Sequence, residues 1–309
     1  MKSTAKNIAV KKSRQTVSFV GAGALASGLA RLLRQSGYQI GEIISRPEPA
    51  SRRRAGALAR AVGAAATTVT AAKFDCDILW LAVPDAVIAE VVTELSAALS
   101  SRAGTSKSGR AMRMPIVLHP SGAHTSQALS PLKKLGASTA SAHPMMTFVA
   151  GSEPSLKGAW FALEGDEAAQ RAARQMAKRL GASSFPIDAA AKPLYHAFGA
   201  MLSPMLASEL AAAEAVGRRA GIASREIRRI MEPIVFRTVA NVLRNGPAKS
   251  FSGPLARGDV ATVASHLQAL GDTAEAAVYR ALSGYALTAL PVKRADEISR
   301  LLQKRGRKS

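Results

Sequence analysis

The feature that most constrains the fold is a glycine-rich turn between a short apolar strand and a helix. The apolar run 17–20 leads directly into Gly21-Ala-Gly23-Ala-Leu-Ala26, and a Leu- and Ala-rich helical segment follows. The first glycine permits a tight turn, the second lets backbone approach a phosphate closely, and the small Ala26 lets the helix pack on the strand. Helix N-termini attract anions, so this context predicts a phosphate cradle rather than a turn without a ligand.

Strand-like and helical segments alternate from residue 15 to about residue 187, a pattern typical of a doubly wound α/β domain. Strands are expected at residues 16–21, 39–45, 78–83, 116–119, 138–143, 160–164 and 184–187. Helices are expected among them at 27–35, 50–62 and 86–99, and an exposed loop at 100–114. The first half of the chain therefore predicts a Rossmann-type, mainly parallel sheet.

After Asp188 the strand patterns stop and helical ones take over. Helices are expected at residues 193–220, 224–245, 259–270, 273–290 and 295–303. Pro204 and Pro233 fall inside these patterns, so we expect kinks or breaks there. The sequence predicts an α/β domain followed by an all-α domain, in three parts: a basic leader at 1–14, an NAD(P)-binding domain at 15–188 and a helical domain at 189–309.

The charge of the chain favours anionic partners. Lys and Arg number 42 against 21 Asp and Glu, which gives +21 at pH 7. The tails 1–14 and 293–309 carry +5 each, which leaves about +11 on the rest, suited to phosphorylated cofactors or acidic metabolites. No nucleic-acid-binding motif or membrane span is recognisable, so neither partner is expected. Cys76 is the only cysteine, which excludes a disulfide scaffold and fits a reducing cytoplasm.

The second expected strand ends in Ser45-Arg46, where an NAD site normally carries an acidic residue for the ribose hydroxyls. Because both side chains offer donors to a 2′-phosphate, we predict NADP (NADPH) and regard NAD as the weaker fit. Arg52–Arg54 could add charge there or form a solvated face. The third expected strand ends in Val83-Pro84-Asp85, with Asp85 expected to cap the next helix. Expected cofactor-binding residues are Gly21, Ala22, Gly23, Ala24, Leu25, Ala26, Ser45, Arg46, Ala82, Val83 and Pro84.

These segments together resemble the 6-phosphogluconate dehydrogenase-like superfamily, which includes pyrroline-5-carboxylate reductase and ketopantoate reductase. Four later strings resemble more closely a group of Rossmann-like proteins with a C-terminal helical domain of unknown function. The strings lie at residues 119–123, 141–148, 192–197 and 252–259. The resemblance covers residues 16 to about 290 and implies an NADP-dependent oxidoreductase that dimerises through its helical half. Relatives tend to carry Asn at the position of Pro204, an amide that this chain lacks.

Candidate catalytic residues are Ser121, Lys192 and His196. Ser121-Gly122 follows the fourth main strand, at the carboxyl edge where ligands of doubly wound sheets bind. Its hydroxyl and backbone N–H groups could grip a substrate carboxylate, or the segment could be a plain turn. Lys192 and His196 lie four residues apart on one helical face, and would face an interdomain cleft or pack at the domain junction.

Candidate substrate-binding residues are Ser121, Gly122, Tyr195 and Arg257, although Arg257 could instead pair with Asp259. His119, His124 and His143 could meet at the strand ends, but they lack metal-motif spacing, so no metal site is expected.

The expected function is reduction of a small carboxylate-bearing oxo or imino compound, such as a 2-oxo acid like ketopantoate or an imine. The alternative is a catalytically silent NADP-binding regulatory protein, which the missing amide at Pro204 would permit. Apolar faces along 202–210 and 227–242 exceed what one small bundle can cover, so we expect a cytoplasmic homodimer built through the helical domain.

Overall fold

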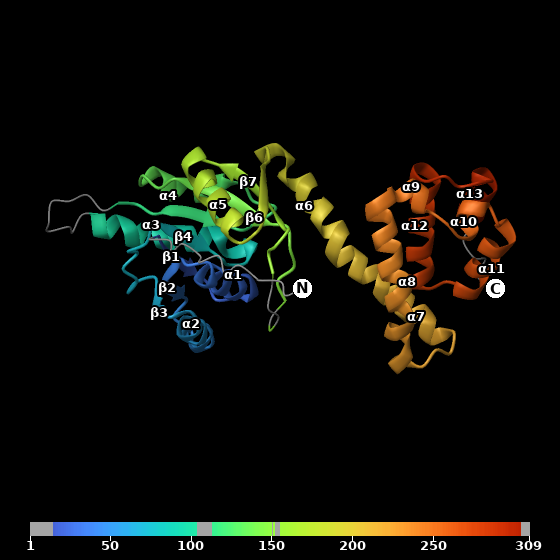
Figure 1. The fold of residues 1–309 in the computed structure, drawn as a ribbon, viewed down its shortest axis with the longest axis horizontal. Helices are drawn as coiled ribbons and strands as arrows, with labels where there is room; N and C mark the ends of the chain where they lie inside the picture. The colour runs from blue at the N-terminus through green and yellow to red at the C-terminus, as the bar shows by residue number, and fades with distance from the viewer. Residues whose placement is uncertain (1–14, 104–112, 150, 152–154, 304–309) are drawn as a thin grey trace, which may run out of the picture. The chain divides into compact units, whose positions relative to one another are not determined.

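The computed structural model describes residues 15–103, 113–149, 151 and 155–303 (Figure 1). The leader expected at 1–14 and most of the loop expected at 100–114 lie outside these residues. The chain divides into two compact units, Met1–Gly199 and Ala200–Ser309. Each unit is described by itself below.

The first unit is built on one sheet of eight strands in the order β3-β2-β1-β4-β5-β6-β7-β8. The strands are β1 Thr16–Val20, β2 Gln39–Ser45, β3 Ala65–Thr68, β4 Ile78–Leu81, β5 Ile116–His119, β6 Thr139–Pro144, β7 Trp160–Gly165 and β8 Ser183–Pro186. Only the β6–β7 pair is antiparallel among them. The predicted mainly parallel sheet is confirmed, and β3 is an edge strand that the sequence did not reveal.

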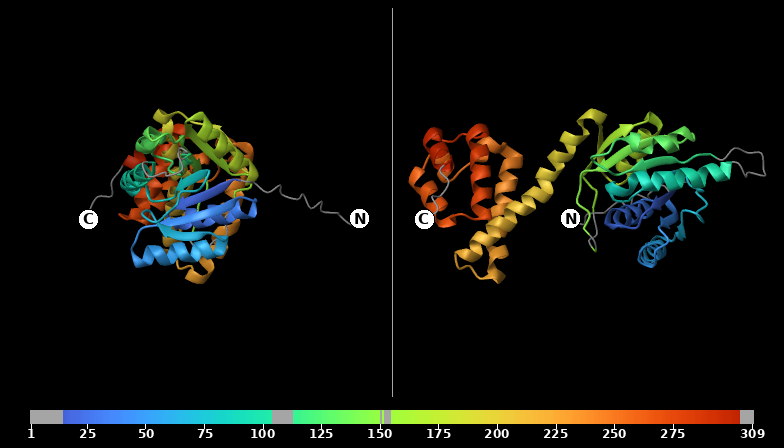
Figure 2. Two further views of the ribbon diagram at one scale, coloured as in Figure 1. Left: turned by 90° about the vertical axis from the view of Figure 1, so that its left-hand side faces the viewer. Right: turned by 180° about the vertical axis from the view of Figure 1, so that it is seen from behind.

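Helices cover both faces of this sheet (Figure 1 and Figure 2). The helices are α1 Ala24–Gln35, α2 Pro49–Val62, α3 Ile88–Ala103, α4 Ser130–Lys134 and α5 Glu167–Arg179. One apolar core joins α1, α2 and α5 to Ile78 and Trp80 of β4, and a second joins α3 and α4 to Leu79 and Leu81. Successive residues of a strand point to opposite faces, so β4 anchors both layers.

Short helical turns lead out of the sheet toward the candidate site. They are η1 Asp85–Val87, η2 Ser126–Leu129 and η3 Ala189–Ala191, and α6 Lys192–Ala200 follows the last of them. Lys192 and Tyr195 of α6 are buried. The strands end at Pro186, close to the domain boundary expected at 188, whereas the compact units divide at Gly199, so α6 counts with the sheet.

The second unit is helical, as predicted. Its elements are η4 Met201–Met205, α7 Leu206–Arg219, α8 Ser224–Asn245, α9 Pro247–Ser250, α10 Pro254–Arg257, α11 Val260–Leu270, α12 Ala274–Ala289 and α13 Ala295–Gln303. Pro204 lies in a π-helical turn, which is the interruption expected there. A kink or a break was expected at Pro233 as well; the helix is not broken there, because α8 continues through that residue. Within the described residues, no helix has the length and apolar character needed to cross a membrane.

Candidate active site

The glycine-rich turn has the geometry of a phosphate cradle. Gly21 has φ +102°, and a Cβ there would overlap the carbonyl oxygen of Ala82. Gly23 is the N-cap of α1, and the space where its Cβ would lie is open. No side chain caps α1 and its first turn carries no acidic residue. The N–H groups of that turn are therefore available to an anion, and the residues fit a dinucleotide pyrophosphate.

The end of β4 lies directly beside this turn. The Ala82 N–H donates to the Val20 carbonyl oxygen at 2.8 Å, and Val83 Cγ1 lies 3.2 Å from the position of a Cβ on Gly21. Pro84 is the N-cap of η1. The structure thus brings together two segments that the sequence assigned to one cofactor site.

Ser45 and Arg46, the two expected cofactor-binding residues at the end of β2, differ in whether their side chains are free to meet a ligand. Ser45 is buried and its hydroxyl donates to the Arg46 carbonyl oxygen at 3.1 Å, so it is not a free donor. The Arg46 side chain is 58% exposed, and its Nε lies 3.8 Å from Glu48 Oε2. Both residues line a cavity of about 520 Å³ that Arg102 of α3 also borders. Of the two candidates, Arg46 is therefore the one with an exposed side chain at this cavity.

Asp85 does not cap the helix that follows it, so that prediction is wrong. The N-cap position of η1 belongs to Pro84, and Asp85 lies inside the turn. Its Oδ2 instead accepts a hydrogen bond from Ser121 Oγ at 2.8 Å. Ser121 Oγ in turn accepts from the backbone N–H groups of Ala123 at 3.2 Å and His124 at 2.9 Å. The one hydroxyl proton and both lone pairs of Ser121 are therefore engaged within the protein.

Lys192 ties α6 to the ends of β5 and β6. Its Nζ donates to Ser141 Oγ at 2.7 Å and to the Ser121 carbonyl oxygen at 3.2 Å. The residue is completely buried, and this burial lowers the pKa of Lys192 against the opposing effect of the Glu164 and Asp85 carboxylates. Lys192 thus fixes the loop that follows β5, residues 120–125, by its hydrogen bond to the Ser121 carbonyl oxygen.

His119 holds the same loop at its start. Its Nδ1 accepts from the Ser121 N–H at 3.2 Å, so Nε2 carries the proton and donates to the Thr125 carbonyl oxygen at 3.0 Å. Burial lowers the pKa of His119 to about 4, which keeps the ring neutral near pH 7. A neutral ring with both nitrogens engaged is a structural element and not a metal ligand.

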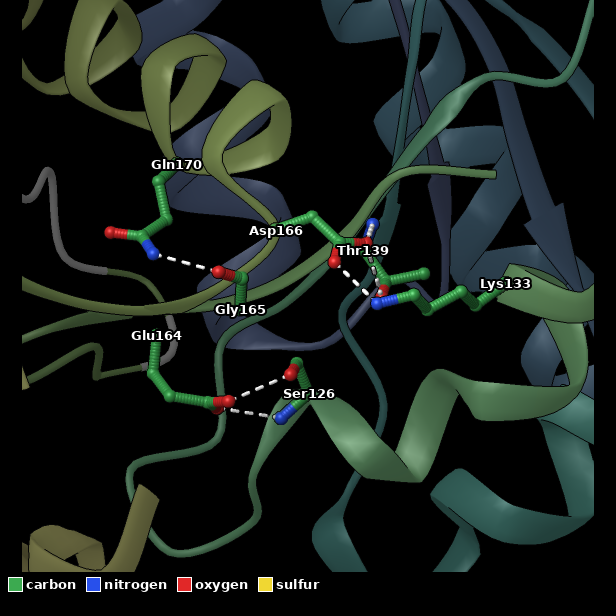
Figure 3. Close-up of polar contacts among 7 residues, drawn as sticks. All are labelled: Ser126, Lys133, Thr139, Glu164, Gly165, Asp166 and Gln170. Carbon is green, nitrogen blue, oxygen red and sulfur yellow. Dashed lines mark hydrogen bonds and ion pairs between the residues drawn. The ribbon is translucent and has the colours of Figure 1, made fainter. Parts of the chain in front are cut away.

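Two carboxylates at the end of β7, Glu164 within the strand and Asp166 just after it, fix the far end of the loop that carries Ser121 (Figure 3). Glu164 accepts from the Ser126 N–H at 2.6 Å and from its hydroxyl at 2.7 Å, at the start of η2. Asp166 accepts from the Thr139 N–H at 2.9 Å and from Lys133 of α4. These bonds join the end of β7 to η2, α4 and β6, so the loop that carries Ser121 is held at both ends.

Two imidazoles flank Gly122 at the exposed side of this cluster. His143 Nδ1 is hydrogen-bonded to the Tyr195 hydroxyl at 2.7 Å, and the His143 and His196 ring centroids lie 6.2 Å apart. A Cβ on Gly122 would lie 2.8 Å from His196 Cδ2 and 3.0 Å from His143 Nε2. His196 is exposed, whereas Tyr195 is buried.

Burial also determines the protonation states of Tyr195 and His143. It raises the pKa of Tyr195 to about 12. It lowers the pKa of His143 to about 4, with Lys192 and His196 adding to the shift. Both groups are therefore neutral near pH 7.

The structure brings together the predicted residues Ser121, Gly122, Lys192, Tyr195 and His196 within the first unit. Sequence reasoning missed Asp85 and His143 as members of this cluster. His143 belongs to one of the four strings that carried the family resemblance, and that was the available signal.

Arg257 lies in the second unit. Its Nε and Nη2 donate to Asp259 Oδ2 at 3.1 and 3.0 Å, which is the pairing considered as its alternative role. Asp259 is the N-cap residue of α11, but its side chain makes no capping hydrogen bond. Among the residues that the structure describes, no three His, Cys, Asp or Glu side chains are grouped to hold a metal ion.

Fold and site together define a doubly wound α/β domain with a glycine-rich turn after its first strand, followed by a helical domain. Comparison with protein families agrees: residues 1–144 match the Rossmann-like domain, and residues 159–286 match the domain of unknown function DUF2520. The chain therefore carries a Rossmann-like domain and a DUF2520 domain in series, which confirms the resemblance found in the sequence.

Solved structures with the same fold include oxidoreductases. The inferred NADP oxidoreductase BF3122 from Bacteroides fragilis is 21% identical with a TM-score of 0.70, over 88% of this chain and 97% of that one. Pyrroline-5-carboxylate reductase from Coxiella burnetii is 17% identical with a TM-score of 0.57, over 93% and 99%. A reductive aminase from Aspergillus terreus, in complex with NADPH4, cyclohexanone and allyl amine, is 17% identical with a TM-score of 0.60, over 93% and 99%. A search of curated proteins found no match.

Proposed function

We propose that this protein is an NADP-dependent oxidoreductase that reduces a small carboxylate-bearing oxo or imino compound. The observation that carries the proposal is the uncapped N-terminus of α1 at Gly23, which lies at the same edge of the sheet as the polar cluster around Gly122. Ligands of doubly wound sheets bind at this edge. The pyrroline-5-carboxylate reductase and the reductive aminase named above support an oxo or imino substrate.

Residues 21–26 would hold the pyrophosphate of the cofactor, and residues 82–84 would contact its nicotinamide half. Arg46 would bind a 2′-phosphate, which favours NADP over NAD. The bound cofactor supplies a hydride to the carbon of the C=O or C=N bond. The chain itself supplies the groups that bind and orient the substrate.

Ser121 and Lys192 serve this site by shaping it. The Ser121 hydroxyl is engaged with Asp85 and two backbone N–H groups, and Lys192 is completely buried. They hold the backbone at Gly122 against the imidazoles of His143 and His196. His196, which is exposed beside Gly122, is the proposed proton donor or substrate anchor.

Oxidation of NADPH and of NADH, followed with a panel of 2-oxo acids and imines, tests the proposal. We expect turnover with at least one such compound and a preference for NADPH. Binding of NADPH without turnover of any of them would favour the silent regulatory protein instead.

Replacing His196 with Ala is the companion experiment. We expect NADPH affinity to stay within about twofold, because the glycine-rich turn is untouched. Turnover should fall by about 100-fold, which is the usual contribution of a positioned acid–base group. Full activity of this variant would remove His196 from the proposed mechanism.

Assembly as a cytoplasmic homodimer through the helical domain completes the proposal. The α8 helix exposes Ile230, Ile234, Phe236, Val239 and Leu243. Exposure of so many large apolar side chains along one helix is typical of a protein–protein interface.

A further inference from the structure

The hydrogen bonds of the cluster decide which groups remain free to touch a substrate. Ser121 Oγ donates a hydrogen bond to Asp85 Oδ2 and accepts hydrogen bonds from two backbone N–H groups, so a substrate could be bound only by breaking one of these bonds. Lys192 has no exposed surface and donates to Ser141 and Ser121. The two candidates that the sequence favoured are therefore already occupied.

His143 is in the opposite situation, because only one of its nitrogens is engaged. Its Nδ1 is bonded to the Tyr195 hydroxyl at 2.7 Å, and the described residues provide no hydrogen-bond partner for Nε2. Nε2 borders the position of a Cβ on Gly122, at 3.0 Å. The half-buried ring thus has one nitrogen without a hydrogen-bond partner among the described residues, and this nitrogen lies beside Gly122.

Tyr195 determines which nitrogen carries the proton. The described residues give its buried hydroxyl a single partner, His143 Nδ1, and a phenol that stays protonated is satisfied there as the donor. Nδ1 then accepts, and a neutral imidazole has its proton on Nε2. The free nitrogen of His143 is therefore an N–H donor that faces away from Tyr195.

We propose that His143 is a substrate-binding residue whose Nε2–H donates a hydrogen bond to an oxygen of the substrate, and that Tyr195 is the positioning residue that fixes its tautomer. The inference rests on the proposed reductase function for the nature of the substrate. A neutral imidazole can polarise or bind an oxygen without giving up its proton, so no proton transfer is involved. His143 and His196 would contact the substrate from opposite sides of the glycine.

Gly122 fits this assignment. A methyl group there would lie 2.8 Å from His196 Cδ2 and 3.0 Å from His143 Nε2, too close for either ring to keep its place. Glycine therefore lets both imidazoles pack against the backbone at this point. Replacing Gly122 with Ala should therefore weaken substrate binding while leaving NADPH binding intact.

Kinetics of His143→Gln and Tyr195→Phe test the roles. His143→Gln should raise KM for the substrate about tenfold, the size of effect expected for one lost hydrogen bond, without changing NADPH affinity. Tyr195→Phe should raise KM less, and adding it to His143→Gln should have almost no further effect. The matched control is His266→Gln, which removes the other His–Tyr pair, His266–Tyr279, and should leave KM unchanged. An unchanged KM in His143→Gln would overturn the proposal.

Nitrogen NMR of histidine-labelled protein provides a readout that does not depend on turnover. The His143 signal, identified by its loss in His143→Gln, should show the proton on Nε2, and a tautomer mixture should appear in Tyr195→Phe. A proton on Nδ1 in the unmodified protein would overturn the proposal.

Ketopantoate and pyrroline-5-carboxylate, added to the NADPH-bound protein, should shift the His143 Nε2–H signal. A shift without turnover would refute the proposed reduction and keep the binding role of His143. Turnover without any shift would refute the binding role and keep the reductase.

Discussion

The two compact units differ in how much of their apolar surface is buried. In the first unit, helices on both faces of the sheet bury two large cores that meet across β4. In the second unit, the described apolar side chains that are buried are Ile227, Val263, Leu267, Leu270, Ala276, Ala286 and Ile298. Its helix α8 buries Ile227 alone and exposes five large apolar residues. The first unit therefore buries most of its apolar residues between sheet and helices, whereas the second exposes large apolar side chains of the kind found at protein–protein interfaces.

The largest effect should come from charging that surface. The double variant Phe236→Asp and Leu243→Asp places two carboxylates on one side of α8, at side chains that are 69% and 82% exposed, so folding of the helix should be little affected. If α8 forms the dimer interface, burying two unpaired charges should cost more than about 4 kcal/mol of association free energy. Light scattering should report a dimer for the unmodified chain at micromolar concentration and a monomer for the variant.

Replacing Arg225 and Arg228 with Ala serves as a control, because it changes the charge of α8 without adding a buried carboxylate. If the unmodified protein is a monomer, the dimer is contradicted, and the exposed apolar side chains of α8 do not form an interface between two copies of the chain.

The first unit should be most sensitive at Gly21. A Cβ there would overlap the Ala82 carbonyl oxygen at a residue with φ +102°, so Gly21→Ala should lower the free energy of unfolding by about 3 kcal/mol. Gly23→Ala is the matched variant, since nothing lies within 4 Å of its Cβ position. It should leave stability nearly unchanged and weaken NADPH binding, because the methyl group would meet the cofactor phosphate. Urea unfolding and NADPH titration of both variants separate the two effects.

An equal loss of stability in the two variants would contradict the separate roles assigned to these glycines. Unchanged NADPH binding in Gly23→Ala would remove the pyrophosphate from this turn.

Acid should destabilise the first unit through its neutral histidines. The pKa of His119 is about 4 in the folded protein and about 6.5 when unfolded, so the unfolded state binds the proton first as pH falls. The stability that His119 contributes is present above pH 6.5 and is lost between pH 6.5 and 4, by up to about 3 kcal/mol. Urea unfolding at pH 7, 5.5 and 4.5 measures it. The loss should be smaller in His119→Gln, which cannot take up the proton, and an equal loss would assign acid sensitivity to other groups.

The sequence predicted the fold better than the site because the two depend on different information. Alternation of apolar strands with helices identified seven of the eight strands, and only β3 escaped, since Ala65–Thr68 has no apolar run at the edge of the sheet. The strings around Ser121 and Lys192 pointed to residues that do come together. Spacing does not encode which rotamer a side chain adopts, so it could not show that Ser121 donates to Asp85 or that His143 keeps one nitrogen free.

The smallest expected effect is on the preference of the first unit for NADPH over NADH. Arg46 is exposed beside the cavity at the end of β2, and its nearest acidic group, on Glu48, lies 3.8 Å away. An exposed ion pair of this kind contributes little, so the guanidinium remains available to a 2′-phosphate. Arg46→Asp should weaken NADPH binding about tenfold and leave NADH binding within about twofold, because NADH has no 2′-phosphate for the new carboxylate to repel. Fluorescence titration with both cofactors measures the ratio. Arg53→Asp makes the same charge change on the exposed face of α2 and should alter the ratio less. If both variants lose NADPH affinity equally, the preference comes from the overall positive charge of the protein rather than from Arg46.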